Sequence, residues 1–150
     1  MKRFSFNLEP ILELRRRAEE NVKKMLANKN AEIYKTLKEK KELEETLISF
    51  LQQEKKNRKE KANLLSLRFF VAYRFQLEKD IIQKEKMLEN LNKEKEKILE
   101  LLSKAKKDVK ALEIIRQKKY KQWEKDYKRE IQEIIDDVSQ KEHIRKKKNL

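Results

Sequence analysis

The residues of this chain that could carry catalytic or metal chemistry are one histidine and 27 carboxylates. His143 lies in a lysine-rich stretch, and the chain has neither a second histidine nor a cysteine to share a metal ion with it. Paired carboxylates work as acid and base only in a cleft that excludes water and shifts their pKa values. Glycine is absent, so no glycine-rich loop can cradle a phosphate. The residue types therefore predict a binding protein, with no catalytic residue, metal or cofactor.

The charge of the chain is strongly basic, because 41 lysines and arginines exceed the acidic residues to give a net charge of +14. Such a balance suits nucleic acid, an acidic membrane surface or an acidic protein, and it also suits a solvated helix surface rich in lysine. The runs Arg15–Arg17 and Lys146–Lys148 could contact phosphates. No base-reading motif or stacking platform accompanies them, so we expect no nucleic acid as partner. A basic coiled-coil protein that binds nucleic acid remains the alternative.

The composition is typical of long helices, since 45% of the residues are charged, 37% are hydrophobic, and Leu, Ile, Lys and Glu dominate. Disorder is the competing interpretation of high charge and low hydropathy. The sequence has no apolar run that would suit a secretory signal or a membrane span. We expect a soluble, cytoplasmic protein.

The second half of the chain carries a heptad pattern, with alternating steps of four and three from residue 77 to residue 123. Lys84, Lys95, Arg116 and Lys119 interrupt this seam. Its other positions are apolar: Leu77, Ile81, Leu88, Leu91, Ile98, Leu102, Ala105, Val109, Leu112 and Trp123. This regularity predicts a coiled coil and argues against disorder.

The first half also shows helical spacing, although it begins with an alternation, Phe4-x-Phe6-x-Leu8, that resembles a strand. Asn7 is a candidate N-cap, which would place Pro10 in the first turn and pair Phe6 with Ile11 as a hydrophobic staple. Phe4 has no such structural role. The apolar positions of this half are Leu8, Ile11, Ala18, Val22, Leu26, Ile33, Leu37, Leu47 and Leu51.

The turn between the halves is marked by QQEKKNRKEKAN, residues 52–63, which has one apolar residue and two asparagines. We predict a single domain over 1–150, with helix 1 at about 8–55, the turn at about 56–64, helix 2 at about 66–143 and a basic tail at 144–150. The fold class is all-α, an antiparallel two-helix coiled coil whose second helix is longer than the first. A turn near 75, one unbroken helix and a parallel homodimer are the alternatives.

The stretch LLSLRFFVAYRFQL, residues 64–77, has more apolar surface than one seam can bury. A β-strand, or packing of the hairpin tip against itself, would also account for it. A bare apolar patch more often marks a partner site, so we expect one among Phe69, Phe70, Tyr73, Phe75 and Leu77.

The end of helix 2 is the other candidate surface. A turn near residue 60 makes Leu8 face about residue 112, and the helix beyond that point lacks an intramolecular partner. It still carries one apolar stripe, formed by Tyr120, Trp123, Tyr127, Ile131, Ile134 and Val138. Phe4 and Phe6 would lie beside its base. We expect another protein to cover this surface, with Trp123 as its anchor.

Two segments of the chain resemble the flagellar export protein FliJ family. The family tends to begin F-x-F-x-L-x-x-[VIL]-L-x-x-R, and here this pattern falls on Phe4, Phe6, Leu8, Ile11, Leu12 and Arg15. A second stretch, E-x-[IL]-R-x-[KR]-[KR]-[YW], falls on Glu113, Ile115, Arg116, Lys118, Lys119 and Tyr120. A late cluster follows at Ile135, Asp136, Asp137 and Val138.

The resemblance implies an antiparallel two-helix coiled coil similar to the central-stalk γ subunit of rotary ATPases. It implies that the termini meet the hexameric flagellar export ATPase, and we expect the surface containing Phe4, Phe6 and Trp123 to make this contact. It implies a second contact with the cytoplasmic domain of the export gate, through Tyr73, Leu77, Asp80 and Lys84, and a link to export chaperones.

From the residues and the resemblance together we expect a non-enzymatic adaptor stalk that couples the ATPase ring to the gate. The chain alone should be monomeric and cytoplasmic, and peripheral at the cytoplasmic face of the inner membrane when assembled. A purely structural homodimeric rod is a further alternative.

Overall fold

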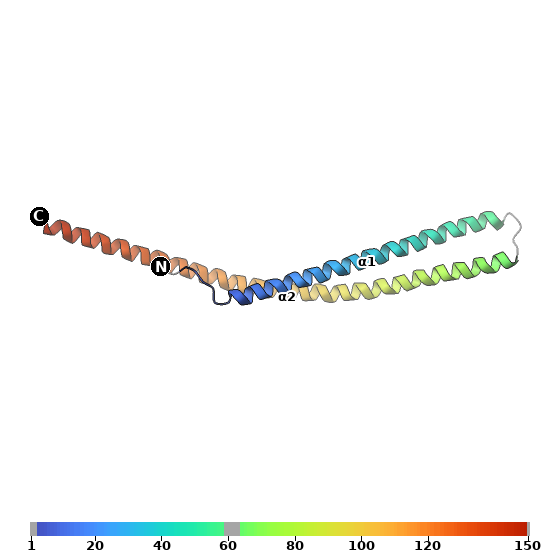
Figure 1. Cartoon of the computed structure of the whole chain (residues 1–150), viewed down its shortest axis with the longest axis horizontal. Coiled ribbons are helices and arrows are strands. Elements are labelled where there is room, and N and C mark those ends of the chain that lie inside the picture. The colour runs from blue at the N-terminus through green and yellow to red at the C-terminus, as the bar shows by residue number, and fades with distance from the viewer. Residues whose placement is uncertain (1–2, 59–63, 150) are drawn as a thin grey trace. The chain divides into compact units, whose positions relative to one another are not determined.

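The computed structural model describes residues 3–58 and 64–149. It contains two helices, α1 at Glu9–Arg58 and α2 at Leu64–Lys148, and no strand among the described residues. The helices pack together as a hairpin (Figure 1). The prediction of an all-α antiparallel coiled coil with a longer second helix is confirmed. No helix in the described ranges is long and apolar enough to cross a membrane.

The alternatives of a turn near 75 and of a β-strand at the tip are wrong. Residue 75 lies well inside α2, and the whole of 64–77 is helical, so the chain neither turns near 75 nor forms a strand there. One unbroken helix is also excluded, because α1 and α2 lie against each other. Most of the predicted turn at about 56–64 falls at residues 59–63, outside the described residues.

The start of α1 is shifted by one residue from the predicted cap. The carbonyl oxygen of Leu8 accepts the first helical bond, from the Leu12 amide at 2.9 Å, so Leu8 occupies the cap position in place of Asn7. Pro10 lies in the first turn, as predicted. One residue turns a helix by about 100°, so Leu12 and not Ile11 packs against Phe6. Ile11 is 45% exposed.

The end of α2 continues to Lys148, through most of the stretch expected as a basic tail. Its last turn holds Arg145, Lys146, Lys147 and Lys148. Cations in a last turn oppose the partial negative charge of the unpaired carbonyls at a helix C-terminus. The lysines that suggested a tail thus suit a helix end.

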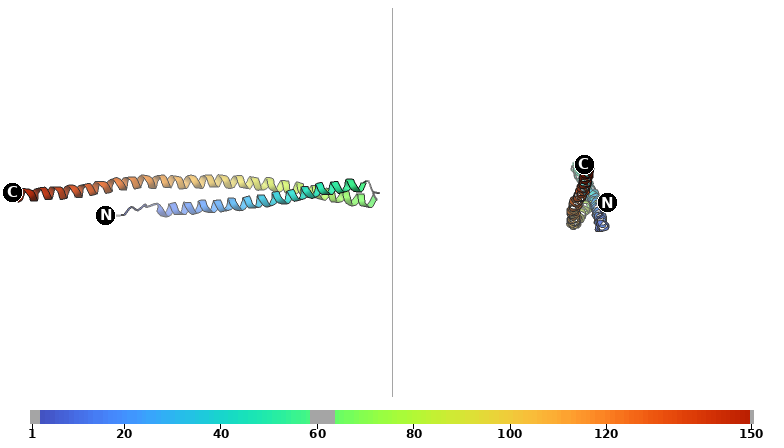
Figure 2. Two further views of the ribbon diagram at one scale, coloured as in Figure 1. Left: turned by 90° about the horizontal axis from the view of Figure 1, so that it is seen from above. Right: turned by 90° about the vertical axis from the view of Figure 1, so that its left-hand side faces the viewer.

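The chain divides into two compact units, each built from a part of both helices, and each is described by itself. Unit 2 comprises residues 20–103 and unit 1 comprises residues 1–19 with 104–150. In unit 2 the two helices lie side by side and run in opposite directions (Figures 1 and 2).

The core of unit 2 is a single seam between the helices. Along α2, every predicted heptad position in this unit is buried or half-buried: Leu77, Ile81, Lys84, Leu88, Leu91, Lys95, Ile98 and Leu102. The facing positions of α1 also alternate in steps of four and three, but polar residues fill several of them: Val22, Leu26, Lys29, Ile33, Thr36, Lys40, Leu43, Leu47 and Phe50. This is why Leu37, which was predicted from its apolar character, is exposed. Ala18, predicted on the same ground, is exposed in unit 1.

Ion pairs between the helices engage the seam positions Lys29, Lys40 and Lys84. Lys84 Nζ lies 2.6 Å from Glu39 Oε2, and Lys29 Nζ lies 2.6 Å from Glu94 Oε2. The buried Thr36 donates its hydroxyl to the Glu32 carbonyl at 2.9 Å. Polar groups therefore take part in the seam without being left unpaired.

The core of unit 1 is a small cluster of Phe6, Leu12 and Val109, against which Phe4, Leu8 and Leu112 pack. Leu12 is fully buried. Leu8 and Leu112 lie on the same cluster, as the predicted register requires. The N-terminal residues before α1 therefore close this end of the hairpin.

Candidate functional site

The first candidate surface is a run of four aromatic side chains in unit 1, Phe4, Tyr120, Trp123 and Tyr127, which we call the aromatic ladder. Phe4 meets Tyr120 edge-on, with 5.2 Å between ring centroids, and Trp123 at 6.0 Å. Trp123 also stacks on Tyr120 at 5.8 Å and on Tyr127 at 5.2 Å. Steps of three and four bring the α2 rings onto one face, and contacts at such spacings are favourable for aromatic pairs.

Arg116 holds the base of the aromatic ladder. Its Nε donates to Glu9 Oε2 at 3.0 Å, and its guanidinium carbon lies 5.5 Å from the centroid of the Phe4 ring. Lys119 Nζ lies 5.8 Å from the Phe6 ring centroid. Both distances are within the range of cation–π attraction. Two residues that interrupt the predicted heptad, Arg116 and Lys119, thus fix the N-terminal aromatics in place.

Beyond the aromatic ladder, α2 carries the C-terminal stripe, which we define as Ile131, Ile134 and Val138. Ile131 is half-buried, whereas Ile134 and Val138 are 58% and 52% exposed. Within unit 1, the last turns of α2 extend past the described N-terminal residues with no second helix beside them (Figure 2). The sequence predicted an overhang from about residue 112, but the unpartnered segment begins later, because the N-terminal segment packs on α2 as far as Trp123.

The structure brings most of the residues predicted for this surface together, with one exception. Phe4, Tyr120, Trp123 and Tyr127 form the aromatic ladder, and the C-terminal stripe continues along the same helix. Phe6 is buried in the core of unit 1 and presents little surface to a partner. Its role is to anchor the N-terminal segment.

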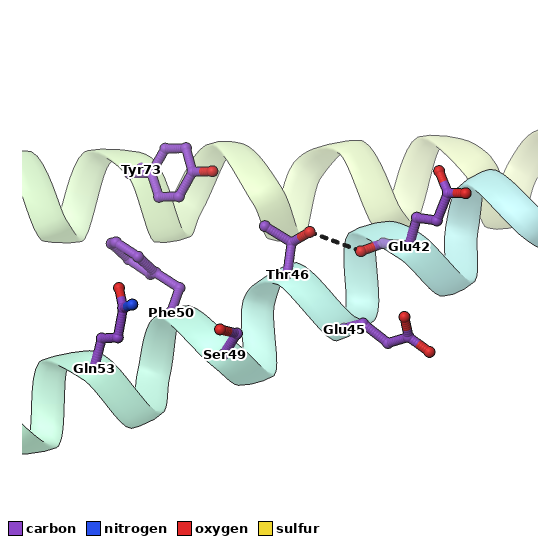
Figure 3. A pocket seen from close by; sticks show the side chains of 7 residues that line it. All are labelled: Glu42, Glu45, Thr46, Ser49, Phe50, Gln53 and Tyr73. Carbon is purple, nitrogen blue, oxygen red and sulfur yellow. Dashed lines mark hydrogen bonds between the residues drawn. The ribbon is translucent and has the colours of Figure 1, made fainter.

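The second candidate surface lies in unit 2 around Phe50 and Tyr73. Phe50 of α1 stacks on Phe70 and meets Tyr73 edge-on, each with 4.6 Å between ring centroids. Beside these rings runs an open groove of about 490 Å³ (Figure 3). Its lining is acidic and polar apart from the two rings: Glu42, Glu45, Thr46, Ser49, Phe50, Gln53 and Tyr73.

Sequence reasoning missed Phe50, because it considered the apolar excess of α2 alone. The signal was available, since Phe50 and Leu51 are adjacent in α1 and both lie at the seam. The tip packs against itself, as one alternative had it, yet apolar side chains remain exposed there. Phe70 is half-buried against Phe50, while Phe69 and Phe75 are largely exposed.

The four residues predicted for the gate contact differ in accessibility. Leu77 is buried between the helices, and Lys84 is half-buried in its ion pair with Glu39. Tyr73 is exposed, and Asp80 accepts a hydrogen bond from Gln76 Nε2 at 3.0 Å. Asp80 is half-buried like Lys84, so Tyr73 is the one residue of the four that is exposed.

Ion pairing shifts the pKa of three groups in unit 2. The hydrogen bond from Lys84 holds the pKa of Glu39 below its ordinary value of 4.5, and Lys29 does the same for Glu94. The hydrogen bond to Glu94 raises the pKa of Lys29. These shifts arise in structural pairs across the seam, not in a catalytic cleft.

Metal ligands are not gathered anywhere in the part of the chain that the structure describes, where no three His, Asp or Glu side chains are placed to hold an ion. His143 lies on the exposed end of α2. The chemistry available at both candidate surfaces is therefore that of aromatic, apolar and charged contacts.

The chain matches the family model of the flagellar FliJ protein over residues 4–148. It belongs to the FliJ family. Searches of curated proteins and of solved structures gave no match. Membership of the FliJ family implies a role in flagellar protein export, within an apparatus to which FliJ proteins belong as non-enzymatic components.

Proposed function

We propose that the protein is an adaptor of the flagellar export apparatus, which binds the export ATPase ring through the aromatic ladder and the C-terminal stripe. In the same proposal the groove beside Tyr73 contacts the cytoplasmic domain of the export gate. The protein would then lie at the cytoplasmic face of the inner membrane when assembled, and would meet export chaperones there. Its contribution is to bind and position these partners.

The exposed stripe on the end of α2 is the observation that supports the proposed ATPase contact. Ile134 and Val138 point one apolar face into solvent, on a segment with no second helix beside it. Most helical stability in proteins comes from packing of such a face. A partner that covers the stripe would supply that packing, and the rings of the aromatic ladder would extend the contact toward Phe4.

The test is binding of the full chain to the hexameric export ATPase, measured with purified proteins. The double variant Ile134→Ser/Val138→Ser should bind at least about tenfold more weakly, because central apolar contacts dominate interfaces. Ile114→Ser is the matched control, since Ile114 is also exposed in unit 1 but lies outside the aromatic ladder and the stripe. Equal loss in the control, or no loss in the double variant, would refute the ATPase contact.

The gate contact is tested separately with Tyr73→Ala, which removes the exposed ring at the edge of the groove. We expect weaker binding to the cytoplasmic domain of the gate and unchanged binding to the ATPase. Tyr34→Ala is the control, because Tyr34 is an exposed tyrosine of the same unit. Loss of both bindings in Tyr73→Ala would show that the variant disturbs the hairpin and would count against a local gate site.

A further inference from the structure

A second seam runs along the start of α2, on the side that faces away from α1. It consists of Leu64, Val71, Phe75 and Ile82, at steps of seven, four and seven. We call these four residues the back seam. Their exposed fractions are 70%, 58%, 67% and 51%. Such steps keep residues within one narrow face of a helix, which is the spacing of a coiled-coil seam.

The back seam is separate from the contact with α1. Two residues along a helix differ by about 200° in direction, so Phe75 points away from the side on which Leu77 is buried. None of its members belongs to the residues proposed for the gate contact. An open apolar groove of about 390 Å³ runs along it, lined by Leu67, Arg68, Val71, Ala72 and Phe75.

Basic side chains accompany the apolar ones on this face. Arg68 occupies the heptad position between Leu64 and Val71, and Lys79 lies one turn beyond Phe75, next to Glu78, which holds the remaining heptad position. Arg68 and Lys79 lie on the same side of the back seam. Both are exposed, and neither has an ion pair among the residues that the structure describes. Arg74, a neighbouring cation, does have such a partner in Glu78.

From this arrangement we propose that the back seam binds an amphipathic α-helix of a partner protein, whose apolar stripe lies on Leu64, Val71, Phe75 and Ile82 and whose flanking acidic residues pair with Arg68 and Lys79. The seam spans about 18 residues, or about 27 Å of helix, which is the length of two to three heptads. The occupant would form a third helix beside the hairpin.

Charge decides between the possible occupants. A second copy of this chain would bring another net charge of +14 to the contact, and repulsion between like charges opposes such association. An acidic helix is instead attracted by the net positive charge of the whole chain and by Arg68 and Lys79 beside the back seam. The occupant is therefore an acidic partner helix and not a second copy.

The experiment uses the full chain and three labelled synthetic peptides of about three heptads each. The first has Leu at its a and d positions and Glu at its flanking e and g positions. The second replaces those Glu residues with Lys. The third has the composition of the first, scrambled so that its leucines share no face. Fluorescence anisotropy at physiological salt measures binding, and sedimentation measures the state of the chain alone.

We expect the Glu peptide to bind and the Lys and scrambled peptides not to. Val71→Ser/Phe75→Ser should weaken binding of the Glu peptide by about tenfold or more. The double reversal Arg68→Glu/Lys79→Glu should transfer the preference to the Lys peptide, an effect that a merely destabilised hairpin would not produce. Tyr34→Ser, an exposed position of α1 in the same unit, is the control and should bind like the unmodified chain.

Three results would overturn the proposal. Equal binding of the scrambled peptide would mean attraction by net charge alone. Binding of the Glu peptide that survives Val71→Ser/Phe75→Ser would place it elsewhere on the chain. Dimerisation of the chain that these two substitutions abolish would assign the back seam to a second copy. Since Tyr73 is not altered in any variant, failure here is distinct from failure of the gate contact.

Discussion

At the level of single residues, the hairpin encloses few side chains completely. Its seam is only one layer deep, so most apolar residues remain partly in contact with water. Leu12 is the exception, with no exposed surface in the cluster of Phe6 and Val109. Adjacent positions on α1 therefore differ sharply in what they contribute to stability.

Leu12→Ala should lower the free energy of unfolding by about 2–5 kcal/mol, the range for large-to-small changes in a core. Leu14→Ala, two residues along the same helix, should have little effect because Leu14 is largely exposed. Urea denaturation followed by circular dichroism measures both. Similar losses in the two variants would contradict the packing of Leu12 against Phe6 and Val109.

The pairs Glu39–Lys84 and Glu94–Lys29 make stability depend on pH in the acidic range. Both carboxyl groups have a pKa lowered from 4.5 in the folded state, so they bind protons less readily there than in the unfolded chain. Their stabilising contribution is present above pH 4.5 and is lost as pH falls through the lowered pKa values.

The double variant Glu39→Gln/Glu94→Gln should therefore melt below the unmodified chain at pH 7 and at nearly the same temperature near pH 2, where the native carboxyl groups are protonated as well. Glu45→Gln is the control, since no ion pair of Glu45 is recorded in the described ranges. A constant difference in melting temperature across this pH range would show that the pairs do not titrate as described.

At the level of the helices, the N-terminal segment and α2 support each other through the aromatic ladder. Trp123, the single tryptophan, is half-buried by Phe4, Tyr120 and Tyr127. It is therefore partly shielded before any partner arrives, and not fully exposed as a bare overhang would require. Phe4 supplies this shielding from outside α2.

Phe4→Ala should shift the emission of Trp123 to longer wavelength and weaken its near-ultraviolet circular dichroism, because one of the rings that cover it is removed. Phe69→Ala, at an exposed ring of unit 2, should leave both signals unchanged. If Phe4→Ala leaves the emission of Trp123 unchanged, then Phe4 does not lie on the tryptophan in solution.

The sequence predicted α2 better than α1 for a physical reason. In α2 the heptad is marked by Leu, Ile and Val from Leu77 to Leu112, and these positions are the ones that face α1. In α1 the facing positions include Lys29, Thr36 and Lys40, which an apolar pattern does not reveal. The partners of Lys29 and Lys40 are carboxylates on α2 up to 65 residues away in sequence, such as Glu94 for Lys29.

A candidate surface could be predicted from the sequence where the residues of a single helix form it. The overhang followed from the position of the turn, and the apolar excess of 64–77 followed from composition. The groove beside Phe50 and Tyr73 could not be found in this way, because it needs residues of both helices. Leu77 was predicted both as a heptad position and, through the resemblance, as a gate contact, and its burial against α1 shows that it belongs to the seam.

At the level of the whole molecule, the net charge of +14 influences encounter more than affinity. Long-range attraction speeds association with an acidic surface and is screened by salt, whereas buried apolar contacts control dissociation. We expect salt between 50 mM and 500 mM to slow association with the ATPase several-fold and to leave the dissociation rate nearly unchanged.

Surface plasmon resonance over this salt range separates the two rate constants. An ATPase that dissociates much faster at high salt would mean that the contact itself is ionic. Binding to unrelated duplex DNA that persists at physiological salt and competes with the ATPase would favour nucleic acid as the partner.

The overhang at the end of α2 also has a consequence for amide hydrogen exchange. Helical hydrogen bonds open easily where no neighbouring element packs against them, so the backbone amides of residues 131–148 should exchange with solvent far sooner than those near Leu12 or Val109. A partner bound to Ile134 and Val138 would protect these amides from exchange. The exchange rates along the last turns would then trace, residue by residue, how far the partner extends toward Lys148.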